Sequence, residues 1–144
     1  MRLNPEKRVF GVEGGKFLRF MLTSRGTEAN PDKCQALENM RIPHDLKEVQ
    51  RLVGRLTSLS RFMPRLADKI RPIFKLTKKA KKFSWNATCE EAFSIVKQAL
   101  SQPPILSKPI PGVPLLVYLA VSPEAMNAAL FRGKTDQKPI YFVN

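Results

Sequence analysis

Residues 45–62 read DLKEVQRLVGRLTSLSRF and contain the clearest structural pattern in the chain. Apolar residues recur through it at Leu46, Val49, Leu52, Val53, Leu56 and Leu59. Their spacing of three and four residues is typical of the buried face of an amphipathic helix. Lys47, Arg51 and Arg55 recur every four residues and share another face. The segment therefore predicts a helix that begins near residues 44–45 and buries its apolar side.

Further helices are predicted on both sides of this one. Asn30 is suited to cap a helix over about residues 31–40, which has a proline in its first turn. A helix over about residues 66–76 must accommodate Pro72, so a break or kink is expected there. A last helix is predicted over residues 87–101, after a capping asparagine.

The N-terminal residues predict a β-hairpin. Two short strands are expected over residues 8–12 and 16–23, joined around Gly14 and Gly15, because glycines tolerate the positive φ of a tight turn. A lone hairpin of this size is marginally stable in water. We therefore interpret this region as the edge of a larger unit.

The C-terminal residues predict a second group of strands. After a Pro-rich stretch, residues 115–121, about 125–132 and 138–143 are expected to form consecutive antiparallel neighbours, because their connections are short. The last of them is expected to be an exposed edge that is prone to association. Together with the helices, these strands predict an α+β fold.

The charge of the chain is strongly positive and unevenly divided. The formal net charge is +13 over 144 residues, which makes nucleic acid the default partner. Residues 1–82 hold 20 Lys and Arg against 8 Asp and Glu, whereas residues 83–144 hold 5 against 4. Any surface that binds a polyanion is therefore expected in the first part.

Several classes of protein are disfavoured by the sequence. The longest apolar run, residues 115–121, is far shorter than a membrane span, and no stretch near the N-terminus has the length of a signal peptide. We therefore expect a cytoplasmic or nuclear protein that is not secreted and has no membrane partner. Cys34, Cys89 and the single histidine, His44, are too few for a disulfide framework or a zinc cluster.

Several sequence segments occur in an order that is typical of one family. They include LNPEKRVFGVEGGKFLRFMLTSRGTEANPDK at residues 3–33, VQRLVGRLTSLSRFMPR at 49–65, FSWNATCEEAFSIVKQAL at 83–100 and PLLVYLAVSPEAMNAALF at 114–131. The series ends with KPIYFVN at residues 138–144. In this order the phrases resemble the gypsy-type LTR-retrotransposon pol polyprotein, and the resemblance extends over essentially the whole chain.

The resemblance implies three parts. Residues 1–24 are similar to the end of a reverse transcriptase palm, residues 25–82 to its helical thumb, and residues 83–144 to the N-terminal part of a connection or RNase-H-like domain. It also implies a template–primer duplex of RNA and DNA as a partner, together with the rest of the pol polyprotein. We therefore expect the chain to be a piece of such a polyprotein.

The carboxylates that the parent enzymes use with Mg²⁺ are not expected in this chain. Two-metal chemistry needs clustered carboxylates, but none of the four aspartates follows a tyrosine or adjoins another. The acid that opens the family's RNase H site falls on Ala120. We therefore expect no catalytic residue, metal ligand or cofactor here.

The candidate nucleic-acid contacts are Lys47, Arg51, Gly54, Arg55, Arg61, Arg65, Lys78 and Lys79. Cations spaced by four residues lie along one helical face, where they can follow a phosphate backbone. The alternative is the solvated face of an amphipathic helix, and for Lys78 and Lys79 a solvated linker. Gly54 costs a helix about 1 kcal/mol relative to alanine, which suggests close approach by a helix or by nucleic acid. Phe83 and Trp85 are predicted to cover the core.

Three functional hypotheses remain open. In the first, the chain is a non-catalytic module that holds template and primer. In the second, RNA-directed DNA polymerase and ribonuclease H activity is assigned to it by inheritance from its parent polyprotein, although the chain in isolation is not expected to be an enzyme. In the third, it is a remnant or interaction module with no nucleic-acid role. Binding that depends on salt concentration distinguishes the first from the third.

Overall fold

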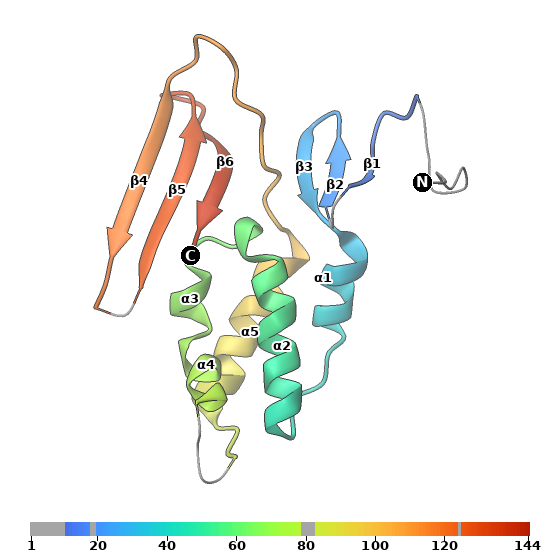
Figure 1. Cartoon of the computed structure of the whole chain (residues 1–144), viewed down its shortest axis with the longest axis vertical. Coiled ribbons are helices and arrows are strands. Elements are labelled where there is room, and N and C mark those ends of the chain that lie inside the picture. The colour runs from blue at the N-terminus through green and yellow to red at the C-terminus, as the bar shows by residue number, and fades with distance from the viewer. Residues whose placement is uncertain (1–10, 18–19, 79–82, 124) are drawn as a thin grey trace, which may run out of the picture.

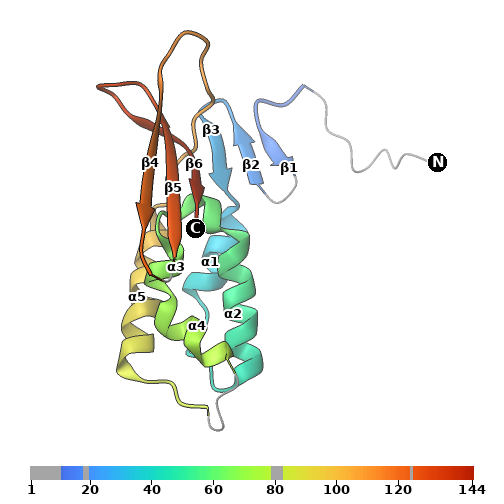
Figure 2. The same cartoon turned by 60° about the vertical axis from the view of Figure 1, so that its left-hand side comes forward.

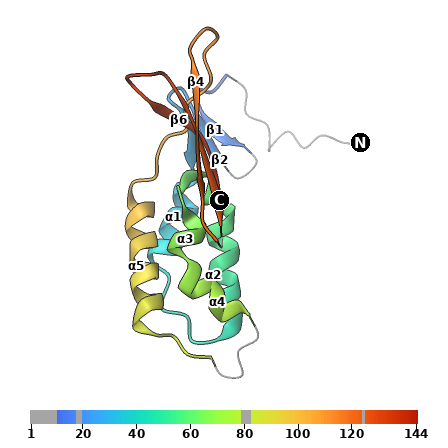
Figure 3. The same cartoon turned by 90° about the vertical axis from the view of Figure 1, so that its left-hand side faces the viewer.

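The computed structural model of the chain describes residues 11–17, 20–78, 83–123 and 125–144. Helices form one half of the molecule, and two three-stranded sheets lie at the same end of the helical half (Figure 1). The views turned by 60° and 90° show the same arrangement (Figures 2 and 3). The predicted α+β class is confirmed. No helix in the described part of the chain is both long enough and apolar enough to cross a bilayer.

The longer helices are α1 (Pro31–Glu38), α2 (Leu46–Ser58) and α5 (Ala87–Ser101). Each begins after a residue whose side-chain oxygen accepts a hydrogen bond from a backbone N–H in the first turn. The capping residues are Asn30, Asp45 and Asn86, with distances of 2.9, 2.7 and 3.0 Å. The predicted asparagine caps and the bounds of α5 are therefore confirmed, whereas α1 ends two residues before the predicted end.

Between α2 and α5 the chain forms shorter helical pieces, namely η2 (Ser60–Phe62), α3 (Leu66–Lys69) and α4 (Arg71–Thr77). The predicted helix over residues 66–76 is interrupted at Ile70, whose φ and ψ are −96° and 6°. Pro72 then lies in the first turn of α4, where its missing N–H removes no intrahelical hydrogen bond. The break expected from this proline is confirmed.

One buried core joins the helices to both sheets. Leu56 of α2 and Val96 of α5 are completely buried in it, and Ala29 and Phe142 contribute from the two sheets. Phe83 and Trp85 pack against the core as predicted, and Trp85 meets Phe93 edge-on at 6.0 Å between ring centroids. Core residues thus lie on both sides of the domain boundary predicted at residue 82, and the three predicted domain ranges stay predictions.

The first sheet consists of β1 (Gly15–Phe17), β2 (Phe20–Thr23) and β3 (Gly26–Ala29), in that order and antiparallel. The prediction of one continuous strand over residues 16–23 was wrong, because this stretch provides two paired strands. Gly15 begins β1, and the turn predicted around Gly14 and Gly15 stays a prediction, because most of the strand expected before it is not described. Of the first predicted strand, residues 8–10 lie outside the described residues.

Strand β3, which the sequence did not predict, is held by a distant segment. The backbone N–H and C=O of Thr27 are both hydrogen-bonded to Leu106, at 2.8 Å each. Gly26 has φ of 146°, and an added Cβ would collide with the carbonyl oxygen of Leu106. The residues around β3 do not predict this strand, because Leu106, which is hydrogen-bonded to Thr27, is about eighty positions away in the sequence.

The second sheet consists of β4 (Leu115–Val121), β5 (Met126–Arg132) and β6 (Lys138–Val143), and the predicted antiparallel neighbours are confirmed. Strand β6 packs against η2, and its Phe142 is only 7% exposed. Ser107 N–H also donates to the carbonyl of Pro139 at 2.7 Å. The last strand is an edge of the sheet, as expected, but it is partly covered, and β4 at the other edge is more exposed.

Candidate nucleic-acid interface

The cations of α2 are exposed along one side of the helix. Lys47, Arg51 and Arg55 are all solvent-exposed, and within the described residues Lys47 and Arg51 make no ion pair. Arg55 has a weak contact, an Nη1 to sulfur distance of 3.8 Å to Met40. These three residues, which we call the α2 basic stripe, therefore present their positive charge to solvent.

The acids near the start of α2 do not neutralise the stripe. Asp45 accepts the backbone N–H of Glu48 at 2.7 Å, and Glu48 in turn accepts the N–H of His44 at 2.8 Å. This exchange resembles a capping box, and it holds both carboxylates at the N-terminus of the helix, where the macrodipole favours negative charge. The sequence thus places acids at the end of α2 and leaves its flank cationic.

A groove between α1 and α2 extends the stripe. Its volume is about 310 Å³, and its lining residues are Asp32, Lys33, Ala36, Leu37, Arg55 and Ser58. Lys33 brings a further cation to the edge of the stripe, while Asp32 is paired with Lys16 at 2.5 Å. Sequence reasoning missed Lys33 because only the packing of α1 beside α2 brings it near Arg55.

Gly54 lies on the exposed side of α2. A Cβ added to it meets no atom within 4 Å. Close approach by a neighbouring helix of this chain, one of the two explanations suggested by the sequence, is therefore excluded for the described residues. The position leaves an open, smooth surface between Arg51 and Arg55.

Arg61 is placed differently from the stripe. Its guanidinium lies over the ring of Phe20, 4.2 Å from the centroid, and 5.2 Å from the ring centroid of Tyr141. Cation–π contacts of this kind are favourable and fix the plane of the guanidinium. Arg61 therefore connects η2 to strand β2 of the first sheet and to strand β6 of the second.

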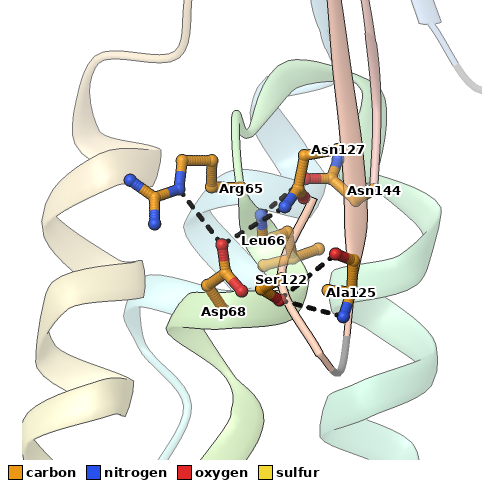
Figure 4. A network of polar contacts seen from close by, with 7 residues as sticks. All are labelled: Arg65, Leu66, Asp68, Ser122, Ala125, Asn127 and Asn144. Carbon is orange, nitrogen blue, oxygen red and sulfur yellow. Dashed lines mark hydrogen bonds and ion pairs between the residues drawn. The ribbon is translucent and has the colours of Figure 1, made fainter. Parts of the chain in front are cut away.

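Arg65 belongs to a polar network at the junction of α3 and the second sheet, which Figure 4 shows. It adopts a left-handed conformation with φ of 56°, and its Nε lies 3.1 Å from Asp68. Asp68 also accepts a hydrogen bond from Asn127 of β5 at 3.2 Å. The charge of Arg65 is thus partly neutralised within the chain.

Asn144 completes this junction. Its side-chain oxygen accepts the N–H of Leu66 at 2.6 Å, and its Nδ2 donates to the carbonyl of Ser60 at 2.9 Å. The bond to Leu66, drawn in Figure 4, ties the end of the second sheet to α3, and the bond to Ser60 ties it to η2. The fold therefore divides the candidate cations of residues 47–65. Lys47, Arg51 and Arg55 form an exposed stripe, whereas Arg61 and Arg65 make contacts within the chain.

Lys78 lies apart from the stripe. It is exposed at the end of α4 and contributes, with Arg71 and Lys75, to the rim of a pocket of about 420 Å³ whose wall includes Val53 and Phe74. Lys79, the other candidate in the lysine run, lies outside the described residues. The structure thus brings Lys47, Arg51 and Arg55 together, and it does not bring Lys78 to them.

Potential metal ligands are scattered. Across residues 11–17, 20–78, 83–123 and 125–144, no three His, Cys, Asp or Glu side chains gather as metal ligands would. Ala120 lies opposite Asn127 in the sheet, so the two side chains point to the same face of the sheet. Asp68 of α3 lies beside that face and accepts a hydrogen bond from Asn127. Sequence reasoning did not identify Asp68 as the carboxylate near this position, because α3 reaches it only through tertiary packing.

Two side chains outside the stripe have shifted pKa values. Burial, followed by the nearby Glu38 carboxylate, raises the pKa of the Cys34 thiol above 9.0. Burial, followed by the positive charge of Arg65, lowers the pKa of Lys69 below 10.5. Cys34 is buried and Lys69 is partly buried, and each lies beside a charge that disfavours its ionised form.

The sequence is similar to segments of transposon polyproteins. Residues 85–144 match the model of an RNase H-like domain found in reverse transcriptase. The retrovirus-related Pol polyprotein from transposon 412 of Drosophila melanogaster is 30% identical over 145 residues, covering 100% of this chain and 12% of that protein. The transposon Tf2-3 polyprotein of Schizosaccharomyces pombe is 24% identical over 136 residues, covering 94% and 10%. The chain thus spans about a tenth of the length of these relatives.

Solved structures show the same fold. The foamy viral protease-reverse transcriptase in complex with dsDNA superposes with a TM-score of 0.75 and 25% identity, over 92% of this chain and 28% of that one. The same viral protein in complex with an RNA/DNA hybrid gives a TM-score of 0.74 and 23% identity, over 91% and 18%. Taken with the polyprotein matches, these likenesses show that the chain is related to a segment of the retrotransposon Pol polyproteins, with an RNase H-like domain over residues 85–144.

Proposed function

We propose that this chain is a non-catalytic segment that holds a template–primer duplex against the α2 basic stripe. Lys47, Arg51 and Arg55 contact phosphates, and Lys33 adds a contact across the groove between α1 and α2. Gly54 allows the sugar–phosphate backbone to approach the helix closely. Phosphate contacts of this kind position a duplex without reading its sequence, so we expect little sequence preference.

The observation that carries the proposal is the exposure of the stripe without compensating acids. Four helical residues rise by about 6 Å, so the three side chains form a row of positive charge along one flank. Such a row releases counterions when it meets a polyanion, and this release drives binding. The viral relatives of the same fold were solved with dsDNA and with an RNA/DNA hybrid, which supports nucleic acid as the polyanion.

The non-catalytic part of the proposal rests on the carboxylates. A two-metal site needs several of them converging from different elements, and the resemblance to the Pol polyproteins implies that Ala120 takes the place of the first. We expect neither the wild type nor Ala120→Asp to release labelled fragments from an RNA/DNA hybrid with Mg²⁺ or Mn²⁺. The variant adds one carboxylate on the face that holds Asp68, which is still too few. Metal-dependent cleavage by the wild type that disappears on mutating a named acid of this chain contradicts this part.

The stripe is tested by removing its charges. Lys47→Ala, Arg51→Ala and Arg55→Ala combined should weaken binding of a labelled primer–template duplex and flatten its dependence on salt. Loss of three phosphate contacts lowers the slope of log K against log salt by about 2.7, since each contributes about 0.9 on B-DNA. Fluorescence anisotropy at several salt concentrations measures both effects.

A matched control removes the same charge elsewhere. Lys108, Lys134 and Lys138 are exposed residues of the C-terminal part, and changing all three to alanine lowers the net charge equally. We expect the control to bind nearly as tightly as the wild type and with nearly the same salt slope. Equal losses in the two triple variants, or no binding by the wild type at low salt, refute the proposal and favour an interaction module without a nucleic-acid role.

A further inference from the structure

A serine hydroxyl lies in the groove between α1 and α2. Ser58, the last residue of α2, lines this groove together with Arg55 of the same helix and Lys33 of α1. Ser58 follows Arg51 by about two helical turns, so it lies on the flank of α2 that carries the α2 basic stripe. A strand that follows the stripe toward the end of the helix therefore passes Ser58.

The proton of this hydroxyl is already used within the helix. Ser58 Oγ donates to the carbonyl of Arg55 at 2.7 Å. A serine hydroxyl has one proton and two lone pairs, so the oxygen can still accept hydrogen bonds. Within the described part of the chain no group donates to it. Toward the groove Ser58 is therefore an acceptor, whose partner must be a donor and not a phosphate oxygen.

The lining of the groove suits a sugar better than a phosphate. Ala36 and Leu37 contribute apolar surface to its volume of about 310 Å³. Asp32 also lines the groove, and its carboxylate, although paired with Lys16, disfavours a phosphate placed inside. Lys33 and Arg55 are available for phosphates next to the groove. A pentose of a nucleic-acid strand has the matching character, with C–H groups on its ring and a phosphate on each side.

We propose that the groove holds a ribose of the strand that lies on the α2 basic stripe, and that Ser58 accepts a hydrogen bond from its 2′-hydroxyl. This inference rests on the proposed nucleic-acid interface and adds a preference to it. A deoxyribose has no 2′-hydroxyl, so it leaves the acceptor in the groove without a donor. Ser58 thereby selects an RNA strand for the stripe by its sugar and not by its base sequence.

The position of the stripe favours a sugar over a base as the donor. Phosphate contacts hold α2 against the sugar–phosphate backbone, and every ribose of that backbone carries a 2′-hydroxyl. In A-form helices the 2′-hydroxyls are displayed along a wide, shallow minor groove, where a protein can reach them without reading the bases. A preference for the sugar is therefore compatible with binding that has little sequence preference.

Two labelled duplexes of one sequence test the preference with the full-length chain. The first is an RNA/DNA hybrid, and the second is the same hybrid with fluorine in place of each 2′-hydroxyl of the RNA strand. Fluorine keeps a ribose-like sugar pucker but cannot donate a hydrogen bond, so the pair separates the hydrogen bond from the helical form. The wild type should bind the first duplex about two- to tenfold more tightly, as expected for one hydrogen bond between neutral groups. Equal Kd values for the two duplexes overturn the proposal.

Two variants assign the preference to one hydroxyl. Ser58→Ala should bind both duplexes with nearly the Kd that the wild type has for the fluorinated one, so the preference disappears. Thr57 also donates its hydroxyl to a carbonyl of the helix, that of Val53 at 2.9 Å, but it does not line this groove. Thr57→Val removes this hydroxyl at nearly constant shape and should keep the preference. A preference that survives in Ser58→Ala, or that both variants lose, contradicts the assignment.

The salt dependence separates this inference from the proposed function. Neither variant changes a charge, so the slope of log K against log salt should be the same for the wild type and both variants. An unchanged slope also shows that the variants are folded around an intact stripe. A steep slope with equal affinity for the two duplexes contradicts the sugar preference alone, whereas absence of binding at low salt contradicts the proposed function as well.

Discussion

The α2 basic stripe and strand β4 are both exposed, yet they differ in chemistry. The flank of α2 is cationic and its opposite side is buried, with Val49 and Leu52 completely inaccessible. Strand β4 is neutral and aliphatic, and Leu119 and Val121 are exposed by more than 70%. Exposed cations are normal on a soluble surface, whereas a long apolar edge is a site of association.

This difference determines how each surface responds to salt. The helix offers long-range, salt-dependent attraction for a polyanion. The strand exposes a short-range apolar surface, whose contacts depend little on salt. Measurements in low and high salt therefore separate the two kinds of interaction: nucleic-acid binding should weaken steeply with salt, and apolar contacts should not.

The largest expected effect comes from the buried side of α2. Leu56→Ala should lower the free energy of unfolding by about 2–5 kcal/mol, since Leu56 is completely buried in the core shared by helices and sheets. Val117→Ala on the exposed edge should change it by less than about 0.5 kcal/mol. Urea denaturation followed by circular dichroism measures both. A loss at Val117 as large as that at Leu56 would show that β4 is covered within the monomer.

An intermediate effect on stability is expected on mutating Arg61. Comparing Arg61 with Arg51 distinguishes a cation that stabilises the fold from one that binds nucleic acid. Arg61→Ala removes the contacts with Phe20 and Tyr141 and should lower stability by about 1–2 kcal/mol. It should leave the salt slope of nucleic-acid binding nearly unchanged. Arg51→Ala should do the reverse, reducing the slope by about 0.9 with little loss of stability.

Arg61→Lys provides the matched control for this pair. Lysine keeps the charge but lacks the planar group that lies over Phe20, so we expect only partial recovery of stability. Chemical denaturation and anisotropy titration on the same preparations give both quantities. If Arg61→Ala lowers the salt slope as much as Arg51→Ala, then Arg61 belongs to the interface after all.

The smallest expected effect is a dependence of stability on alkaline pH. The pKa of Cys34 is raised in the folded state by burial and by Glu38, so the unfolded chain loses this proton first. The contribution of Cys34 is therefore fully present below about pH 9 and is lost as pH rises through the folded pKa. Lys69 has the opposite sign, because its lowered pKa makes stability rise with pH over its own interval. Comparing unfolding of the wild type and Cys34→Ala from pH 8 to 10.5 isolates the thiol, and a steeper decline in the variant contradicts the assignment.

Much of the local structure was determined by the sequence alone. The caps at Asn30 and Asn86, the bounds of α5 and the break before Pro72 follow from backbone chemistry within a few residues. The antiparallel order of the second sheet follows from short connections between alternating apolar segments. The resemblance to Pol polyproteins was also visible in the order of the sequence segments along the chain.

The tertiary structure decided which residues of the basic series share a surface. Spacing by four residues groups Lys47, Arg51 and Arg55 because they lie on one helix, but it does not reveal that Arg61 is held by aromatic rings of two sheets. It also does not reveal that Leu106 forms a bridge with Thr27 of β3. Periodicity and capping act over a few residues, whereas these contacts depend on which distant segments the shared core brings together.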